Sequence, residues 1–202
     1  NYKHVRANWV FQFEPTAFYN YTRNLIQLAM VDAATQLYTN INIGSFQSAG
    51  GRISTKFRYK SLTIEAAGGF MGVLSKFGVP AEAINPPKML FTPEATLTVS
   101  YRYEKWGIGA ASFYKFTGAA QGYYLTDERK PALSQMGAYH LWDLTVNKTF
   151  WAKRLTLTVG ARNLLNVTAI NAVQAAGAHN TGGTTAQMGT GRSFFAGLGL
   201  QF

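Results

Sequence analysis

The chain has 202 residues, of which 47 % are hydrophobic and 14 % charged, and this length suits one domain with an interior or part of a larger one. The charged fraction lies below the roughly 25 % of a soluble domain, yet no run of about 18 uncharged apolar residues occurs, which excludes helical membrane spans. The net charge is +10, and the Lys and Arg residues are scattered singly along strand-like segments without a basic run or basic helix, which argues against nucleic acid as a partner. The absence of cysteine excludes disulfide scaffolds and thiolate metal sites.

Alternation of apolar and polar side chains with period two predicts β-strands along the first part of the chain. Over residues 9–22, aromatic residues alternate with polar ones, and Phe18 is the exception on the polar face. Pro15 predicts a bulge or local bend, since proline removes a ladder hydrogen bond. A second strand covers about 38–59, where the Gly50-Gly51 pair predicts a bulge or twist.

The second strand carries cations on one face only. Arg52, Lys56 and Arg58 alternate with Ile53 and Phe57. A cation that faces lipid at the bilayer midplane costs roughly 2–4 kcal/mol. These cations are therefore predicted to point into the lumen of a barrel.

Further strands are predicted by the same alternation, at 62–74, 94–103, 106–124, 142–150, 155–162 and 191–202. Short turns follow Tyr59, Tyr103 and Phe150, whereas long loops are predicted near 32–36, 75–93, 126–137 and 168–190. Short connections at one end and long connections at the other are typical of outer-membrane barrels. Lys148 is on an apolar face but close to a turn, where its amine could snorkel to the membrane interface.

The last stretch, from Gly191 to Phe202, has one apolar face and one face of mostly small or polar residues. A barrel in a membrane needs this arrangement, because lipid covers the outside and no unpaired backbone group can face hydrocarbon. A terminal aromatic after such a strand resembles the carboxy-terminal signal of bacterial outer-membrane barrels, which implies that the insertion machinery recognises Phe202. The sequence thus predicts an all-β, antiparallel transmembrane barrel with about eight strands here, and an ordinary sandwich strand is the alternative for this stretch.

Residues Gly160 to Thr168 read Gly-Ala-Arg-Asn-Leu-Leu-Asn-Val-Thr. This segment resembles the penultimate strand of TonB-dependent outer-membrane transporters, which commonly carries Gly-x-x-Asn-Leu-hydrophobic-Asn/Asp before the final loop and strand. Residues 17–26, 42–44 and 51–54 are similar to an earlier strand-loop-strand unit of that family. The loop at 178–180, running into 191–195, is similar to members from the Bacteroidota.

The resemblance implies that residues 1–202 are the carboxy-terminal segment of a barrel of about 22 strands, with the plug domain and the earlier strands outside this chain. The implied location is the outer membrane of a Gram-negative bacterium. The implied function is uptake of a scarce nutrient, which is a metal chelate, haem, vitamin, peptide or glycan, with energy transmitted by TonB. No TonB-contacting box is recognisable near the N-terminus.

The partners implied by the resemblance are the rest of the barrel and its plug, the TonB complex acting through the plug, and the barrel-assembly machinery. Membrane lipid, lipopolysaccharide and a surface lipoprotein complete that set. An independent eight-stranded outer-membrane barrel with a structural or adhesive role is the alternative. Such a barrel closes around its own side chains.

The candidate lumen-lining residues are the charges on polar strand faces: Arg52, Lys56, Arg58, Glu65, Arg102, Asp143 and Arg162. The alternative is that such charges only solvate the wall or pair with the plug. His140 and His179, at or near predicted outer loops, are weaker ligand candidates, and two distant histidines without a carboxylate cluster predict neither a metal site nor a cofactor. No serine has a nucleophile-elbow context, so a membrane-embedded hydrolase is the least favoured class.

Overall fold

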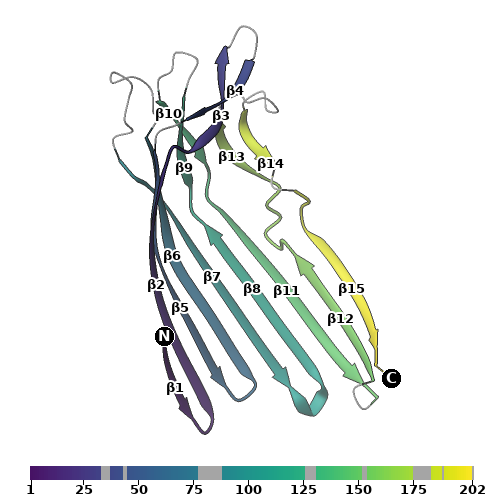
Figure 1. Ribbon diagram of the computed structural model, residues 1–202. Coiled ribbons are helices and arrows are strands. Elements are labelled where there is room, and N and C mark those ends of the chain that lie inside the picture. Colours follow the sequence, from purple (N-terminus) through teal and green to yellow (C-terminus); the bar gives the residue numbers. More distant parts are fainter. Residues whose placement is uncertain are drawn as a thin grey trace.

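The computed structural model describes residues 1–32, 37–42, 45–76, 88–125, 131–151, 154–174, 183–187 and 189–201. These residues form antiparallel β-structure with one short 3₁₀ helix, η1 (Glu104–Trp106). One long sheet carries most of the chain, and smaller sheets lie beyond one end of it (Figure 1). No helix in the described residues has the length and apolar character needed to cross a membrane.

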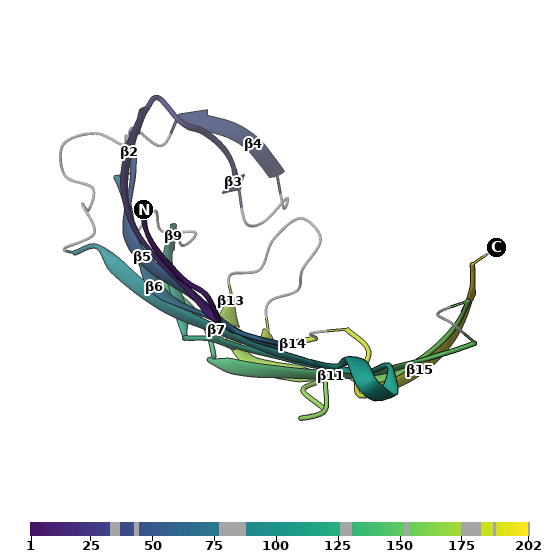
Figure 2. The ribbon, with the colours of Figure 1, turned by 90° about the horizontal axis from the view of Figure 1, so that it is seen from below.

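The long sheet has nine strands, each antiparallel to its neighbours. In spatial order these are β1 (Tyr2–Arg6), β2 (Trp9–Arg23), β5 (Ser45–Tyr59), β6 (Leu62–Lys76), β7 (Leu90–Tyr103), β8 (Ile108–Thr117), β11 (Tyr139–Phe150), β12 (Leu155–Arg162) and β15 (Ser193–Leu200). The sheet curves into an open trough (Figure 2). Within the described residues β1 pairs only with β2, and β15 only with β12, so a closed eight-stranded barrel is not formed.

Tight turns join the strands at one end of the long sheet, called here the short-turn end. The turns at 60–61 and 151–154 use positive φ angles at Lys60 (50°) and Trp151 (49°), and η1 ends on Gly107 at 61°. At the other end the chain forms the hairpin of β3 (Ile26–Asp32) and β4 (Leu37–Asn42). Beside it lies a four-stranded sheet of β14 (Gly183–Gln187), β13 (Ala169–Gln174), β10 (Pro131–Met136) and β9 (Ala120–Leu125). The predicted short turns at one end are confirmed, whereas 33–36 and 77–87 of the predicted long loops lie outside the described residues.

Two predicted loops contain strands, which corrects the expectation for 126–137 and 168–190. β10 pairs with β9 and also with β13, where Gln135 lies opposite Val173. The predicted strand 106–124 likewise divides into η1, β8 and β9, and the predicted strand 38–59 into β4 and β5. The division follows from pairing with distant segments, which alternation along one segment does not reveal.

The strand β1 was missed by the sequence analysis. Its five residues lie opposite β2, with Tyr2 opposite Phe13 and Arg6 opposite Trp9. A turn at Ala7 and Asn8 joins the two strands. The segment is too short and too mixed in polarity for alternation to identify it. Its pairing with β2 gives nine strands in place of about eight.

Of the bulge or local bend predicted at Pro15, the bulge is wrong, because the β2–β5 register runs unbroken from Glu14 opposite Ser54 to Thr16 opposite Arg52. The backbone amide of Lys60 donates to the carbonyl of Asn8, which makes the even-numbered residues of β2 the ones that bond to β5. The Pro15 nitrogen therefore points to the other side of β2, beyond the end of β1. Its missing N–H therefore removes no hydrogen bond between β2 and β5.

Of the bulge or twist predicted at Gly50-Gly51, the bulge is also wrong, since the register stays continuous on both sides of β5. Gly50 lies opposite Phe18 and Met71, and a β-carbon at Gly50 would come within 2.6 Å of the Phe18 ring. The absence of a side chain at Gly50 thus makes room for the one aromatic residue of β2 that departs from the alternation.

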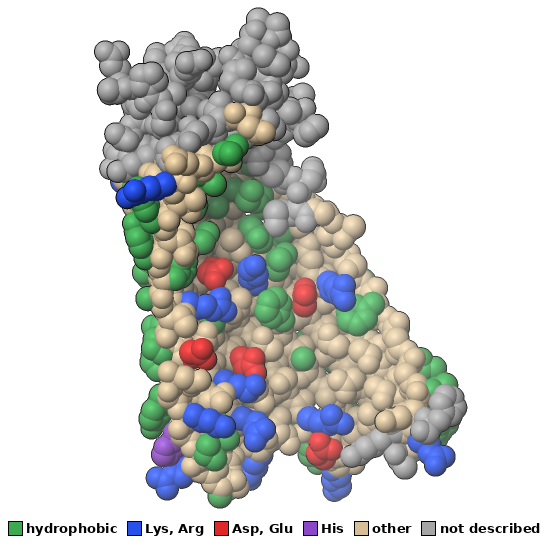
Figure 3. Space-filling view, in the orientation of Figure 1, with side chains coloured by type: hydrophobic (Ala, Val, Ile, Leu, Met, Phe, Trp, Pro, Cys, Tyr) green, Lys and Arg blue, Asp and Glu red, His purple; other side chains and the backbone are tan. Residues whose placement is uncertain are grey.

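The two faces of the long sheet differ in character. Its convex face carries exposed apolar side chains from most of the long strands, among them Ile53, Phe70, Leu97, Leu144 and Leu198. The concave face, seen in Figure 3, carries acidic and basic side chains. An apolar surface of this extent is uncommon on a water-soluble monomer, so the convex face requires lipid.

Candidate functional site

A row of side chains crosses the middle of the concave face, because the strand registers bring one residue from each of seven strands opposite the next. The row consists of Lys3, Gln12, Lys56, Glu65, Thr98, Phe113 and Asp143. Three of the predicted lining residues belong to it. Most of its members are polar, as expected for a surface that faces water.

Two cross-strand ion pairs lie on β5, β6 and β7. Lys56 Nζ is 2.6 Å from Glu65 Oε1, and Arg52 Nη1 is 2.8 Å from Glu94 Oε1. The Arg52 side chain reaches over β6 at Gly69, the residue paired with both Arg52 and Glu94. With 44 % of both the Arg52 and the Glu94 side chain exposed, such a pair contributes about 0–1 kcal/mol. Both pairs therefore fix the positions of charges more than they stabilise the sheet.

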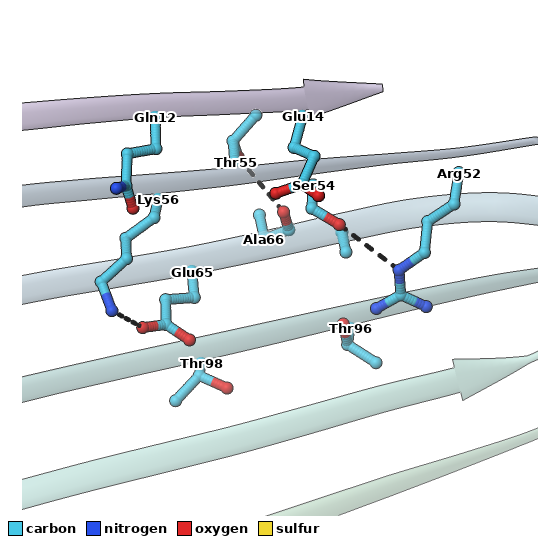
Figure 4. Close-up of a pocket in the computed structure, with 11 residues that line it drawn as sticks. Gln12, Glu14, Arg52, Ser54, Thr55, Lys56, Glu65, Ala66, Thr96 and Thr98 are labelled. Atoms are coloured by element: carbon cyan, nitrogen blue, oxygen red, sulfur yellow. Dashed lines mark hydrogen bonds and ion pairs between the residues drawn. The ribbon is translucent and has the colours of Figure 1, made fainter. Parts of the chain in front are cut away.

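A shallow cavity of about 290 Å³ lies between and beside these ion pairs. Its lining is polar and comes from β2, β5, β6 and β7, as Figure 4 shows: Gln12, Glu14, Arg52, Ser54, Thr55, Lys56, Glu65, Ala66, Ala67, Thr96 and Thr98. Glu14 forms no ion pair within the described residues. The cavity thus offers carboxylate, ammonium, guanidinium, amide and hydroxyl groups to a polar surface that fills the trough.

Arg58 and Arg102 lie nearer the short-turn end of the concave face. Arg102 Nε is 3.0 Å from Glu104 Oε1, and both side chains are more than half exposed. Arg58, opposite Val10 and Thr63, has no ion-pair partner in the described part of the chain. These two residues are thus separate from the cavity around Lys56.

Asp143 and Arg162 occupy the polar face of β11 and β12 but contact the protein itself. The backbone amide of Asn163 donates to Asp143 Oδ1 at 2.8 Å. The Arg162 guanidinium lies 5.2 Å from the centre of the Phe195 ring, a cation–π distance. The structure therefore gives Asp143 a partner in the turn after β12, and Arg162 a partner on β15.

The segment that carries the family resemblance forms a tight turn after β12. Asn163 and Asn166 adopt left-handed conformations, with φ of 52° and 57°, which asparagine tolerates better than other residues with a side chain. The Asn163 side chain accepts from the Val167 amide and donates to its carbonyl, both at 2.9 Å. Asn166 Oδ1 accepts from the Arg192 amide, so this turn holds the start of the last strand.

His140, the described histidine of the two candidates, does not lie on the concave face. His140 is the second residue of β11 and lies on the convex side, with Nδ1 2.6 Å from the Tyr114 hydroxyl and its ring 4.9 Å from that of Phe116. His179 and Phe202 lie outside the described residues. No group of three or more potential metal-ligating side chains occurs within the described residues.

Gln12 and Glu14, which line the cavity, and Glu94, which pairs with Arg52, were not among the predicted lining residues. The alternation already placed all three on polar faces, so the signal was available from the same pattern that selected Glu65. The position of Gly69 between Arg52 and Glu94 could not be predicted, because it depends on which residues lie opposite Gly69 on both neighbouring strands.

A single curved β-layer, apolar on its convex face and polar on its concave face, defines a wall segment of a membrane β-barrel. A protein-family model described as "TonB dependent receptor-like, beta-barrel" matches residues 5–164. The chain belongs to this family. Members of the family are barrels of the bacterial outer membrane, and that is where the chain resides.

Comparison with solved structures agrees on the fold. The FrpB iron transporter from Neisseria meningitidis (F3-3 variant) is similar over 97 % of this chain, with a TM-score of 0.64 and 12 % sequence identity. The chain spans 28 % of the length of that transporter. A search of curated proteins gave no match. The family and this neighbour are transporters rather than enzymes, which confirms that the chain is not an enzyme.

Proposed function

We propose that this chain is the carboxy-terminal part of the barrel wall of an active transporter, which takes up a scarce nutrient with energy transmitted by TonB. The observation that carries the proposal is the polar concave face on a sheet of the TonB-dependent receptor family. In this proposal residues 1–202 form wall only, and the plug domain and earlier strands belong to the remainder of the transporter. TonB acts through the plug.

The role proposed for the lining residues is to present charge toward the lumen. Arg52, Lys56 and Glu65 meet the plug or the passing nutrient at the cavity, whereas Arg58 and Arg102 act nearer the short-turn end. Asp143 and Arg162 act mainly through the contacts they make with Asn163 and Phe195. Selectivity in such a path comes from the groups that line it.

The nutrient proposed for the first test is a ferric chelate, because the similar solved structure is that of an iron transporter. Haem, a vitamin, a peptide or a glycan are the other substrates of the proposal. The barrel-assembly machinery at Phe202, lipopolysaccharide and a surface lipoprotein are proposed partners.

Two measurements test the proposal. The first compares the mass of the folded, detergent-purified particle with the masses of its heat-denatured chains. A particle that contains this chain together with further strands and a plug supports the proposal, whereas a folded monomer of 22.2 kDa contradicts it.

The second measurement is uptake of iron-55, supplied as a panel of ferric chelates, by cells of the native host. Uptake that is lost on deleting the gene and also on deleting TonB supports transport of a ferric chelate. Uptake that needs the gene but persists without TonB contradicts energy transmission. No dependence on the gene removes ferric chelates as the substrate, and the panel is then repeated with haem.

A further inference from the structure

Basic side chains gather at the short-turn end of the long sheet. Arg6, Lys60, Lys105, Lys148 and Arg154, called here the basic rim, come from successive turns or from the strand residues beside them. Four of the five are exposed, and Lys148 is half-buried. The acidic residue among these turns, Glu104, is paired with Arg102 at 3.0 Å. Within the described residues no carboxylate lies within ion-pair distance of the basic rim.

Large aromatic side chains lie at the same level as the basic rim. Trp106 and Trp151 are 61 % and 75 % exposed, and Tyr103 packs edge-on against Trp106 at 5.2 Å between ring centres. Tyr59 and Phe150 are also exposed and stand on the convex face. Aromatic residues of this kind concentrate at the level of lipid headgroups in membrane barrels.

Two amines of the basic rim lie against these rings. Lys60 Nζ lies 5.3 Å from the centre of the Tyr59 ring, and Lys148 Nζ lies 5.5 Å from that of Phe150. Lys148 also donates to the carbonyl of Trp106, so its amine reaches the turn as the sequence analysis predicted. Since Tyr59 and Phe150 belong to the convex face, these two amines lie beside the face that meets lipid.

We propose that the basic rim binds the phosphodiester headgroups of anionic phospholipids in the periplasmic leaflet of the outer membrane. Short turns of outer-membrane barrels face the periplasm, and the rim presents cations at the headgroup level. The proposal uses the membrane location of the family and does not depend on transport. Each basic residue near an anionic lipid surface changes affinity by about fivefold.

The test uses the intact, detergent-purified protein that contains this chain. Native mass spectrometry compares its retention of phosphatidylglycerol with that of phosphatidylcholine of the same acyl chains. The test variant carries K60Q, K105Q and R154Q, since these three side chains donate no hydrogen bond to the described protein groups. The control variant carries R23Q, K88Q and K115Q, which removes the same net charge away from the rim.

We expect the wild-type protein to prefer phosphatidylglycerol, the test variant to lose at least about tenfold of that preference, and the control to stay within about twofold of wild type. An equal loss in both variants would show an effect of overall charge and would overturn the proposal. Absence of a preference in the wild type would also overturn it. Binding of purified peptidoglycan that depends on the same three cations, without a lipid preference, would assign the rim to the cell wall instead.

Gel mobility without heating shows whether the test variant folds. If it does not fold, the salt dependence of phosphatidylglycerol retention by the wild-type protein tests the proposal instead. Raising the ionic strength from 0.15 M to 1 M shortens the screening length from about 8 Å to about 3 Å. The preference for phosphatidylglycerol should then fall steeply. A preference that is independent of salt would contradict binding through exposed cations.

Discussion

The turn after β12 provides the sharpest test of how the family motif works. Asn163, which is 8 % exposed, makes two side-chain hydrogen bonds to Val167 and sits at a φ of 52°. Replacing it by alanine removes both hydrogen bonds, at about 1 kcal/mol each. Alanine also lacks the polar side chain that lets asparagine tolerate the left-handed region, which costs about 1–2 kcal/mol more. We therefore expect Asn163→Ala to lower the free energy of unfolding by about 3–4 kcal/mol.

The matched variant is Asn163→Gly, which loses the same hydrogen bonds without the steric cost of a β-carbon at positive φ. It should lower the free energy of unfolding by about 2 kcal/mol. Urea titration in detergent, with the folded fraction measured from gel mobility without heating, gives both values. A change below about 0.5 kcal/mol for alanine, or a larger loss for glycine than for alanine, would refute the reasoning.

Three further predictions concern the two faces of the long sheet. Gly50→Ala should destabilise the protein by about 1–3 kcal/mol, since its β-carbon would meet the Phe18 ring, whereas Gly68→Ala has space and should change little in the same urea titration. Lys56→Gln should change the free energy of unfolding by less than about 1 kcal/mol, because the ion pair with Glu65 is half exposed, and a loss above about 2 kcal/mol would contradict that assignment. Leu97→Arg on the convex face should cost about 2–4 kcal/mol in folding into lipid vesicles, whereas Thr98→Arg on the concave face should be tolerated, and equal costs would refute the assignment of the faces.

Much of the wall could be predicted from local patterns. The alternation after Gly51 assigned Arg52, Lys56 and Arg58 to one face and Ile53 and Phe57 to the other, and the structure places the two sets on opposite faces of the long sheet. This succeeds because side-chain direction in a strand depends only on the parity of the position. Parity and distance to a turn likewise placed Lys148 on the apolar face with its amine near the turn, where it donates to the Trp106 carbonyl.

The partners of the predicted residues could not be predicted from these patterns. Arg52 meets Glu94, 42 positions away, across a glycine of the strand between them. Asp143 was selected as a lining residue, yet it accepts a hydrogen bond from the Asn163 backbone. Both outcomes depend on the registers of adjacent strands, which loop lengths and turn geometry set.

The bulges at Pro15 and Gly50-Gly51 were wrongly predicted for one physical reason. Proline and glycine each weaken a strand locally, which the sequence shows, but whether the ladder is disturbed depends on the neighbouring strand. Pro15 turns its nitrogen away from β5, and Gly50 lies under the ring of Phe18.

The sequence by itself determined the class of the sheet, its two chemically opposite faces and the alternation of short and long connections, because these follow from the period of the strand and from the solvent on each side. Only the tertiary structure decided that the described long sheet has nine strands and open edges, and which charges pair across its strands. It also decided that the basic rim lies beside aromatic side chains at the short-turn end. These features arise from contacts between residues far apart in the chain, whose relative placement is fixed by backbone pairing between strands.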